Sequence, residues 1–345
     1  MFESSNFRRG TLMTRMCDDL RHRWIGQSII GGILAGVLAD AAGAADPPAA
    51  TEPSTAQGPA APPGLPPPSP TEAVVDKWKF NLLNPTPREL MRPMSTDRPD
   101  VTESPMSVDA GHLQLEMSFA DYTYDRSDGE SVHALAVAPF LLKLGLLNNV
   151  DLQFGFTPYS RVQTRGDADP AEADALVADV SNTLLLLEGL GDILLRMKVN
   201  VWGNDEGPTA FAIMPFVTLP TGSGGLGSDD VEGGVVMPFG ADLPLGFSLG
   251  LMAQFDFVRY EDRGGYYAEF IHTGTIGHDL FDDVGAFVEY VGIESLGPDR
   301  PYQAYFNAGM TWQPGADLMF DAGVRIGLNS ASEDIGVFVG MSIRH

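Results

Sequence analysis

Charged side chains alternate with apolar ones in several segments of the chain after residue 111. Around residues 192–200, Asp192, Arg196 and Lys198 share one parity, while Ile193, Leu195 and other apolar residues hold the opposite one. Carboxylate, guanidinium and ammonium groups on a common face can form ion pairs or line a water-filled space. The candidate interior residues are Glu116, Asp151, Asp192, Arg196, Lys198, Asp256, Tyr260, Glu269, Glu289, Tyr305, Asp321 and Arg325, with Lys143 as a further candidate.

Two interpretations of this charged set stay open. The groups could line a conduit that selects among solutes, with tyrosines adding aromatic surface. They could also fill an interior with a packed network of salt bridges and hydrogen bonds, because charges in a narrow space need partners or solvent. The two interpretations are compatible with each other.

No recognised catalytic motif accompanies these residues. The sequence lacks G-x-S-x-G, H-E-x-x-H, a Walker loop and a G-x-G-x-x-G that precedes a helix. Residues 222–227 are glycine-rich but lack the lysine of a phosphate loop. The acidic run around His278 fits a solvated turn better than a metal site. We therefore expect no enzyme activity, no cofactor and no metal ion.

A period of two predicts the elements that position the charged groups. Leu113, Leu115 and Met117 alternate with Gln114 and Glu116, as in a strand with one apolar and one polar face. The candidate strands are 112–124, 131–144, 149–161, 190–203, 208–220, 231–243, 245–260, 265–278, 284–294, 301–313, 316–328 and 333–344. Segments 208–220 and 231–243 alternate poorly, so a count of ten strands stays open beside twelve.

The length and connection of these segments favour a membrane barrel. Most exceed the ~5–6 residues of soluble strands and reach the ~9–11 that a tilted membrane strand needs. Short turns, such as 147–148 and 314–315, alternate with longer polar connections, such as 162–189. The predicted fold is all-β: an antiparallel up-and-down transmembrane β-barrel of about 12 strands.

The residues before the barrel divide into three regions. Residues 1–45 resemble a cleavable signal peptide, with arginines, an apolar run at 24–38 and Ala42-Gly43-Ala44, although translation could start at Met1, Met13 or Met16. Residues 46–70 hold ten prolines and predict a disordered linker. Residues 71–111 form a periplasmic entry segment, and residues 112–345 form the barrel. Export to the bacterial outer membrane follows from this order.

The entry segment contains a charged block at residues 96–100. Arg98 lies between Asp97 and Asp100 and could form charge-assisted hydrogen bonds inside the barrel or at its periplasmic mouth. The block could act as a plug or latch. It could equally be an entry turn that only positions the first strand.

Composition excludes several other functions. The chain has 46 acidic and 21 basic residues, a net charge of −25 and a sequence pI near 4.3. Nucleic-acid binding needs a basic surface, so no nucleic-acid partner is expected. Cys17 is the single cysteine and lies in the predicted leader, so no disulfide can form within the chain.

The sequence STDRPDVTESPMSVDAGHLQLE at residues 95–116 resembles the opening of a bacterial family labelled "putative MetA pathway of phenol degradation". Shorter matches occur at residues 189–192, 219–222 and 340–344, and the resemblance covers about residues 95–345. It implies an outer-membrane barrel that passes small aromatic or hydrophobic solutes. Lipid of the outer membrane and the barrel-assembly machinery would be its partners. Such barrels commonly end in an aromatic residue, whereas this chain ends in His345.

The function expected from these features is a channel or transporter for small organic solutes. The alternative is a structural outer-membrane barrel with a closed lumen, whose proline-rich arm engages a periplasmic or envelope partner. The arm keeps this alternative open, because a channel alone has no need of it.

Overall fold

The computed structural model describes residues 76–127, 129–166, 183–260, 263–297 and 300–345. The predicted signal peptide and proline-rich linker lie outside these residues. Residues 78–345 belong to one compact unit, which is described below. Within the described part of the chain, no helix has the length and apolar character needed to cross a membrane.

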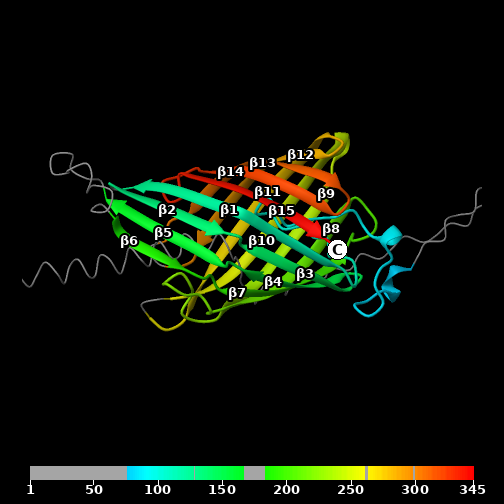
Figure 1. Cartoon of the computed structure of the whole chain (residues 1–345), viewed down its shortest axis with the longest axis horizontal. Coiled ribbons are helices and arrows are strands. Elements are labelled where there is room, and N and C mark those ends of the chain that lie inside the picture. Colours follow the sequence, from blue (N-terminus) through cyan, green and yellow to red (C-terminus); the bar gives the residue numbers. More distant parts are fainter. Residues whose placement is uncertain (1–75, 128, 167–182, 261–262, 298–299) are drawn as a thin grey trace, which may run out of the picture. The chain divides into compact units, whose positions relative to one another are not determined.

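The unit is a single antiparallel β-sheet that closes on itself, because β15 pairs with β1 (Figure 1). Three short 3₁₀ helices accompany the strands: η1 (Lys77–Lys79), η2 (Arg88–Leu90) and η3 (Pro244–Gly246). The strands are β1 (Leu113–Ser127), β2 (Glu130–Val137), β3 (Phe140–Leu147), β4 (Val150–Phe156), β5 (Tyr159–Gly166), β6 (Thr183–Gly189), β7 (Ile193–Trp202), β8 (Thr209–Leu219), β9 (Glu232–Asp242), β10 (Phe247–Arg259), β11 (Tyr266–Phe281), β12 (Val284–Ser295), β13 (Gln303–Gly315), β14 (Leu318–Gly327) and β15 (Ile335–Arg344).

Three of the crossings are broken in the middle. β1 pairs along one half with β2 and along the other with β3, so β2 and β3 form one crossing interrupted at residues 138–139. The same relation joins β4 to β5 and β6 to β7. Each of these three strand pairs crosses the wall once, so the fifteen described strands make twelve crossings. This confirms the predicted count of twelve and excludes ten. Pro139 and Pro158 lie at two of the breaks, where a residue without an amide hydrogen cannot extend the ladder.

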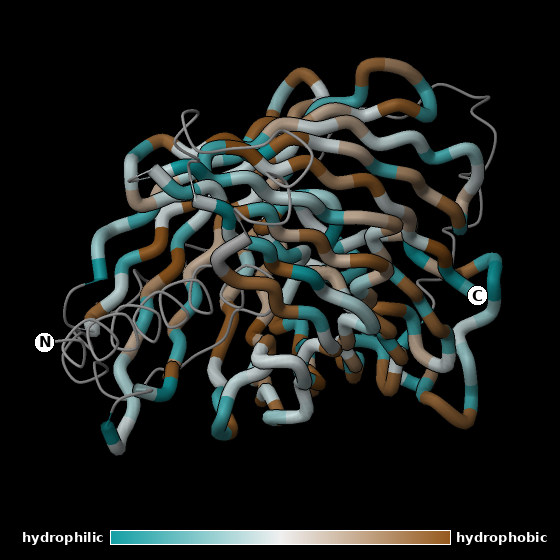
Figure 2. Tube along the Cα trace, turned by 60° about the vertical axis from the view of Figure 1, so that its left-hand side comes forward, coloured by the Kyte–Doolittle hydropathy of each residue, from teal (hydrophilic) through white to brown (hydrophobic). Residues whose placement is uncertain are grey.

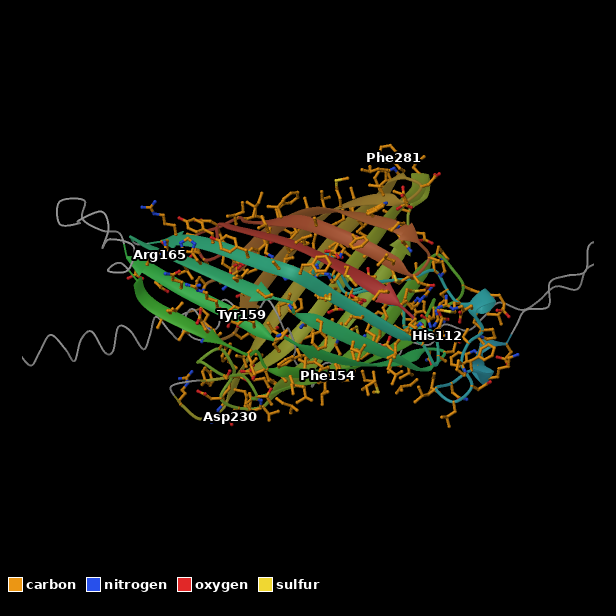
Figure 3. The ribbon with its side chains drawn as sticks, viewed as in Figure 1. His112, Phe154, Tyr159, Arg165, Asp230 and Phe281 are labelled. Carbon is orange, nitrogen blue, oxygen red and sulfur yellow. The ribbon has the colours of Figure 1, made fainter. Side chains whose placement is uncertain are left out.

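Short turns gather at one end of the barrel. The turns β3–β4, β7–β8, β9–β10, β11–β12 and β13–β14 lie at this end, together with the C-terminus. The Leu113 amide donates to the His345 carbonyl and joins the first strand to the last residue there. Figure 3 places Phe281 and His112 at this turn end and Arg165 at the opposite, loop end. The arrangement is that of a membrane barrel with short periplasmic turns.

The two faces of the wall differ in polarity, as the alternating colours along the strands show (Figure 2). In β1, Leu113 is 41% exposed on the outside, whereas Gln114 and Glu116 are each 1% exposed on the inside. Apolar side chains project from the outer face (Figure 3). Hydrocarbon surroundings favour this outer surface, and the polar side chains turn to the interior.

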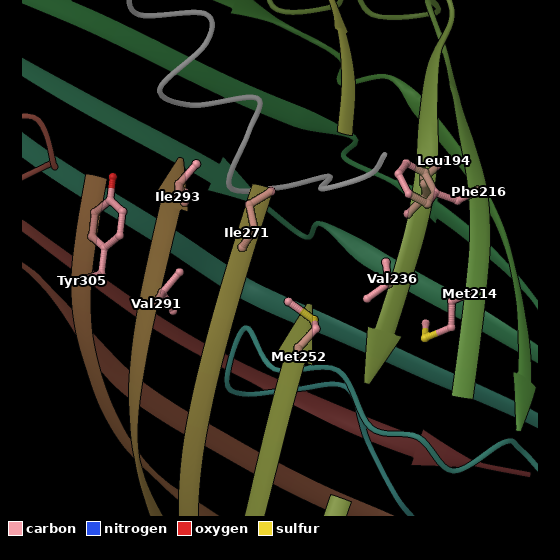
Figure 4. Packing of buried hydrophobic residues seen from close by; sticks show 9 residues of the cluster. All are labelled: Leu194, Met214, Phe216, Val236, Met252, Ile271, Val291, Ile293 and Tyr305. Carbon is pink, nitrogen blue, oxygen red and sulfur yellow. The ribbon is translucent and has the colours of Figure 1, made fainter. Parts of the chain in front are cut away.

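One part of the interior is apolar, however. Buried side chains of β7 to β13 form a strip along the inner wall (Figure 4), and Val101 and Leu141 pack against it. The strip consists of Leu194, Met214, Phe216, Val236, Met252, Ile271, Val291, Ile293 and Tyr305. Met214, Phe216 and Val236 belong to β8 and β9, which explains why segments 208–220 and 231–243 are apolar on both parities.

Candidate conduit

Residues 92–109, called here the inner segment, run inside the barrel. Their backbone amides donate to inward carboxylates of several strands: Val108 to Asp151 Oδ2 at 3.0 Å, and Val101 to Glu289 Oε2 at 2.9 Å. The inner segment belongs to no strand, so its buried N–H groups need hydrogen-bond acceptors from side chains. The inward carboxylates of the barrel supply those partners.

Asp97 lies at the centre of a buried ionic cluster. Lys198 Nζ donates to Asp97 Oδ1 at 2.7 Å, and Arg196 Nη2 donates to Asp97 Oδ2 at 3.2 Å. Lys143 Nζ contacts both Asp97 and Glu116. Burial acts to raise the pKa of Asp97, but the ammonium groups of Lys143 and Lys198 and the Arg196 guanidinium hold it well below its usual range. Asp97 is therefore ionised and bound.

Glu116 and Glu289 each bind two consecutive amides of the inner segment. Glu116 Oε2 accepts from the amides of Asp97 at 3.0 Å and Arg98 at 3.2 Å. Glu289 accepts from the amides of Val101 and Thr102, and Asn307 Nδ2 donates to it at 2.7 Å. Hydrogen bonds to ionised acceptors are about twice as strong as neutral ones, so these carboxylates fix the path of the segment.

Arg98 joins the inner segment to β14 and β1. Its Nη2 and Nε donate to the two carboxylate oxygens of Asp321 at 2.6 and 3.2 Å, a bidentate pair. Its Nη1 donates to Ser118 Oγ at 2.6 Å. Arg325, further along β14, lies 3.6 Å from Asp121 and faces the ring of Phe338.

A second cluster holds the turn end of the inner segment. The Arg92 amide donates to Asp109 Oδ2 at 3.0 Å, and the Arg92 guanidinium donates to the Asn148 carbonyl and to Asp205. Arg344 Nη1 in turn donates to the Arg92 carbonyl at 2.8 Å. Neither Arg92 nor Asp109 lies in an alternating segment, so the sequence pattern predicted no role for either.

Two cavities lie against the inner segment. The first, the break-side cavity, has a volume of about 220 Å³ and includes Pro139, Phe140, Phe156 and Thr157 at the strand breaks. The second, the turn-side cavity, has a volume of about 370 Å³ and includes the β7–β8 turn. Both volumes lie near or below the lower end of the range of about 300–1,000 Å³ for small-molecule sites. They suit a small solute.

Asp100 and Glu103 line both cavities. Burial raises the pKa of the Glu103 carboxyl to about 7, against the opposing effect of the Arg196 guanidinium. Burial, together with the nearby Glu289 carboxylate, raises the pKa of Asp100 well above its ordinary value. The two residues shared by the cavity linings thus carry carboxyl groups that take up protons more readily than ordinary ones.

The structure places most of the candidate interior residues in three settings. Those that contact the inner segment are Glu116, Asp151, Arg196, Lys198, Glu289 and Asp321, while Arg325 lines the break-side cavity beside Arg98. Asp256 and Glu269 face each other across β10 and β11. Tyr305 belongs to the apolar strip, and its hydroxyl donates to Gln303 at 2.9 Å.

Asp192 and Tyr260 line neither cavity. Asp192 accepts hydrogen bonds from the amides of Thr221, Gly222 and Ser228, and so it orders the β8–β9 loop. Tyr260 follows the end of β10, where the guanidinium of Arg263 lies 3.9 Å from its ring. Inward parity suggested Asp192 as a lumen residue, and Tyr260 was suggested for its aromatic surface. Each lies directly beyond the end of a strand, beside a loop.

Gln254 is a lining residue for which the sequence pattern predicted no role. It is 1% exposed, it lines the break-side cavity, and its amide nitrogen has no hydrogen-bond partner among the described residues. Its inward parity in β10 was the signal that could have found it. No group of three or more metal-ligating side chains occurs in the described ranges.

A solved outer-membrane structure is similar in fold to this chain. The COG4313 outer membrane channel from Pseudomonas putida F1 matches with a TM-score of 0.53 and 11% identity, over 73% of this chain and 100% of that chain. The NanC porin matches with a TM-score of 0.41 and 7% identity, over 67% and 98% of the two chains. The toluene transporter TbuX of Ralstonia pickettii matches with a TM-score of 0.39 and 7% identity, over 68% and 89%.

A comparison with curated proteins finds no match. A family model, in contrast, covers the barrel strands and nearly all of residues 95–116, on which the resemblance described above rests. The model of the family described as "Putative MetA-pathway of phenol degradation" matches residues 96–345, and the chain belongs to this family.

Proposed function

We propose that the protein is an outer-membrane channel for small, weakly polar organic solutes. The observation that carries this proposal is the pair of cavities beside the inner segment, which share Asp100 and Glu103 in their linings. A barrel with a purely structural role has no need of such cavities. The solute passes beside the inner segment, through the space that its side chains leave.

The lining of the break-side cavity supports solutes with apolar surface. Phe140 and Phe156 have the parity of the outer face, yet they line this cavity at the strand breaks, opposite charged residues of the inner segment. Leu141 and Leu194 add aliphatic surface. A compound with an aromatic ring and one polar group finds partners of both kinds here.

In this proposal the inner segment is a fixed constriction. The clusters around Asp97, Arg98 and Arg92 attach it to β1, β3, β7 and β14 and to the turn end. Removing one member of a buried ion pair costs about 3–5 kcal/mol, so thermal motion alone does not release the segment. The block 96–100 therefore acts as the plug that narrows the lumen. Export through a cleavable leader and insertion by the assembly machinery complete the proposal.

Liposome swelling tests the channel function. Purified protein, checked by heat-modifiable migration, is reconstituted and exposed to neutral solutes of graded size. Swelling is expected with small solutes that carry a ring and a hydroxyl group, with a steep fall as size increases. A folded protein that admits no solute of any size would refute the channel.

The alternative is a structural barrel with a closed lumen. The density of buried ion pairs around Asp97 favours it, since such a network also fits an interior that only needs filling. Liposome swelling, measured for the intact protein and for a variant that lacks residues 95–104, separates the two functions. For a channel, the deletion raises the size limit of the admitted solutes. For a structural barrel with a closed lumen, the intact protein shows no swelling before the deletion is made.

A further inference from the structure

Two carboxyl groups belong to the linings of both cavities. Asp100 and Glu103 line both the break-side and the turn-side cavity, and no other described residue does so. A solute in either cavity therefore lies beside these two side chains.

The Asp100 carboxyl group faces two other carboxyl groups and shares a hydrogen bond with Thr275 of β11. The neighbouring Glu289 carboxylate of β12 already accepts from the amides of Val101 and Thr102 and from Asn307. Glu289 thus holds the backbone on one side of Asp100, and it repels a negative charge there. Glu103 is the other acidic group that faces Asp100.

Glu103 faces β7 and the rest of the inner segment. Arg196 contacts both of its carboxylate oxygens, with Nη2 donating to Oε2 at 3.0 Å. Asp97, Asp100, Lys143 and Lys198 are the other charged groups near it. Lys198 and Arg196 also bind Asp97, so the Asp97 and Glu103 carboxyl groups share these two cations. The Glu103 side chain is 17% exposed, whereas that of Asp97 is 5% exposed, which leaves Glu103 in contact with the cavity.

An unpaired donor lies beside the same cavity. The amide nitrogen of Gln254 has no partner among the described residues, although the side chain is almost fully buried and lines the break-side cavity. A hydroxyl or carbonyl oxygen of a solute is the kind of acceptor that this donor lacks. The guanidinium groups of Arg98, Arg196 and Arg325 line the same cavity.

We propose that Asp100 and Glu103 form the selectivity constriction of the channel, which passes neutral solutes with a hydroxyl or carbonyl group and cations, and which rejects anions. A protonated carboxyl group can both donate and accept a hydrogen bond, as a phenolic or alcoholic solute can. A carboxylate at the same place repels an anion in a narrow, poorly solvated passage. This inference rests on the proposed channel function.

The constriction should change with pH. The pKa of Glu103 is raised to about 7, and the pKa of Asp100 is raised well above its usual range. Both carboxyl groups therefore carry less charge in acid and become carboxylates as the pH rises. Rejection of anions strengthens in that direction, while neutral solutes are affected less.

Ion selectivity in planar bilayers tests the proposal. The cation-over-anion permeability ratio is measured from reversal potentials in a potassium chloride gradient between about pH 5 and about pH 9, across the range in which raised carboxyl groups titrate. We expect the ratio of the natural protein to rise about tenfold with pH. Asp100→Asn and Glu103→Gln should each reduce this rise, and the double variant should abolish it.

Glu89→Gln is the matched control, because Glu89 is an exposed carboxylate of η2 that lines neither cavity. It should behave as the natural protein does. Swelling with benzyl alcohol and with benzoate gives a second readout: the double variant should admit benzoate several-fold faster at high pH, with benzyl alcohol unchanged. Asp100→Asn and Glu103→Gln are each checked by heat-modifiable migration.

The outcomes separate two failures. The protein could conduct ions with a permeability ratio that changes neither with pH nor with either substitution. The constriction would then lie elsewhere, and the inference would be overturned while the channel function stands. If folded protein neither conducts ions nor admits any solute at any pH, the channel function fails and the inference fails with it.

Discussion

Lys198 of β7 donates to Asp97 of the inner segment at 2.7 Å, although the two residues are 101 positions apart in the chain. Lys198 is 0% exposed, so this ion pair lies in the barrel interior. Through this ion pair, a segment that precedes the first strand is fixed to β7. The charges that alternate along the strands thus have partners in the inner segment as well as on neighbouring strands.

Asp97→Asn should release the inner segment more than any substitution of an exposed ion pair. It leaves Lys143, Lys198 and Arg196 with one anion fewer, and breaking a buried pair costs roughly 3–5 kcal/mol. Urea denaturation followed by heat-modifiable migration measures the loss, and limited proteolysis between residues 92 and 109 measures the release.

Asp230→Asn is the control for this experiment. Asp230 pairs with Arg259 at the same distance of 2.7 Å, but the Asp230 side chain is 49% exposed. Exposed pairs contribute about 0–1 kcal/mol, so the change should be small. Equal effects of the two substitutions would contradict the role of Asp97 as the anchor.

The bidentate pair of Arg98 and Asp321 should show a measurable coupling free energy. Arg98→Lys keeps the charge but cannot form the two parallel hydrogen bonds, and Asp321→Asn removes the charge. A double-mutant cycle on unfolding should give a coupling of about 0.5–3 kcal/mol, the range for residues in direct contact. A coupling indistinguishable from zero would mean that the pair does not hold the inner segment.

The stability of the protein should depend on pH through Glu103. Its pKa is raised from an ordinary value of 4.5 to about 7, chiefly by burial, so the folded state binds the proton more tightly than the unfolded state. The contribution of this group to stability is therefore present below the unfolded pKa and is lost as the pH rises through about 7. Glu103→Gln should reduce the fall of the unfolding free energy between pH 4.5 and about pH 7. The reduction should be on the order of 1–3 kcal/mol.

Asp97 acts in the opposite direction. Its pKa is held below the ordinary value of 3.8, so its contribution is present above that pH and is lost in stronger acid. A stability profile in which Asp97→Asn and Glu103→Gln change the same pH range would contradict these assignments. The two substitutions should affect separate windows.

The sequence predicted the twelve crossings because alternation and turn residues are local signals. It did not show the breaks in segments 131–144 and 149–161, which Pro139 and Pro158 mark. It also placed β6 (Thr183–Gly189) and the end of β5 in the connection 162–189, which was wrong. Alternation failed in β8 and β9 because their inward residues join the apolar strip. The pairing of Asp97 with Lys143 and Lys198 depends on the path of residues 92–109 through the barrel, and no local pattern encodes that path.

Phe140 and Phe156 give the last prediction, which concerns the passage of apolar solutes. Their rings lie 6.2 Å apart at the strand breaks, and both side chains line the break-side cavity. Phe156→Ala removes most of one aromatic side chain and enlarges that cavity without changing charge. Liposome swelling with substituted benzyl alcohols should then extend to bulkier rings, while the rate for a small polar solute such as glycerol changes little.

Phe281→Ala is the matched control, since Phe281 is 71% exposed at the β11–β12 turn (Figure 3) and lines neither cavity. The stability cost of Phe156→Ala should stay below the about 3–5 kcal/mol of a fully buried phenylalanine, because the ring is only partly buried. If both substitutions shift the size limit equally, the effect is a general loosening of the wall. A shift with Phe156→Ala alone places the apolar route at the strand breaks, where Pro139 and Pro158 interrupt the ladder.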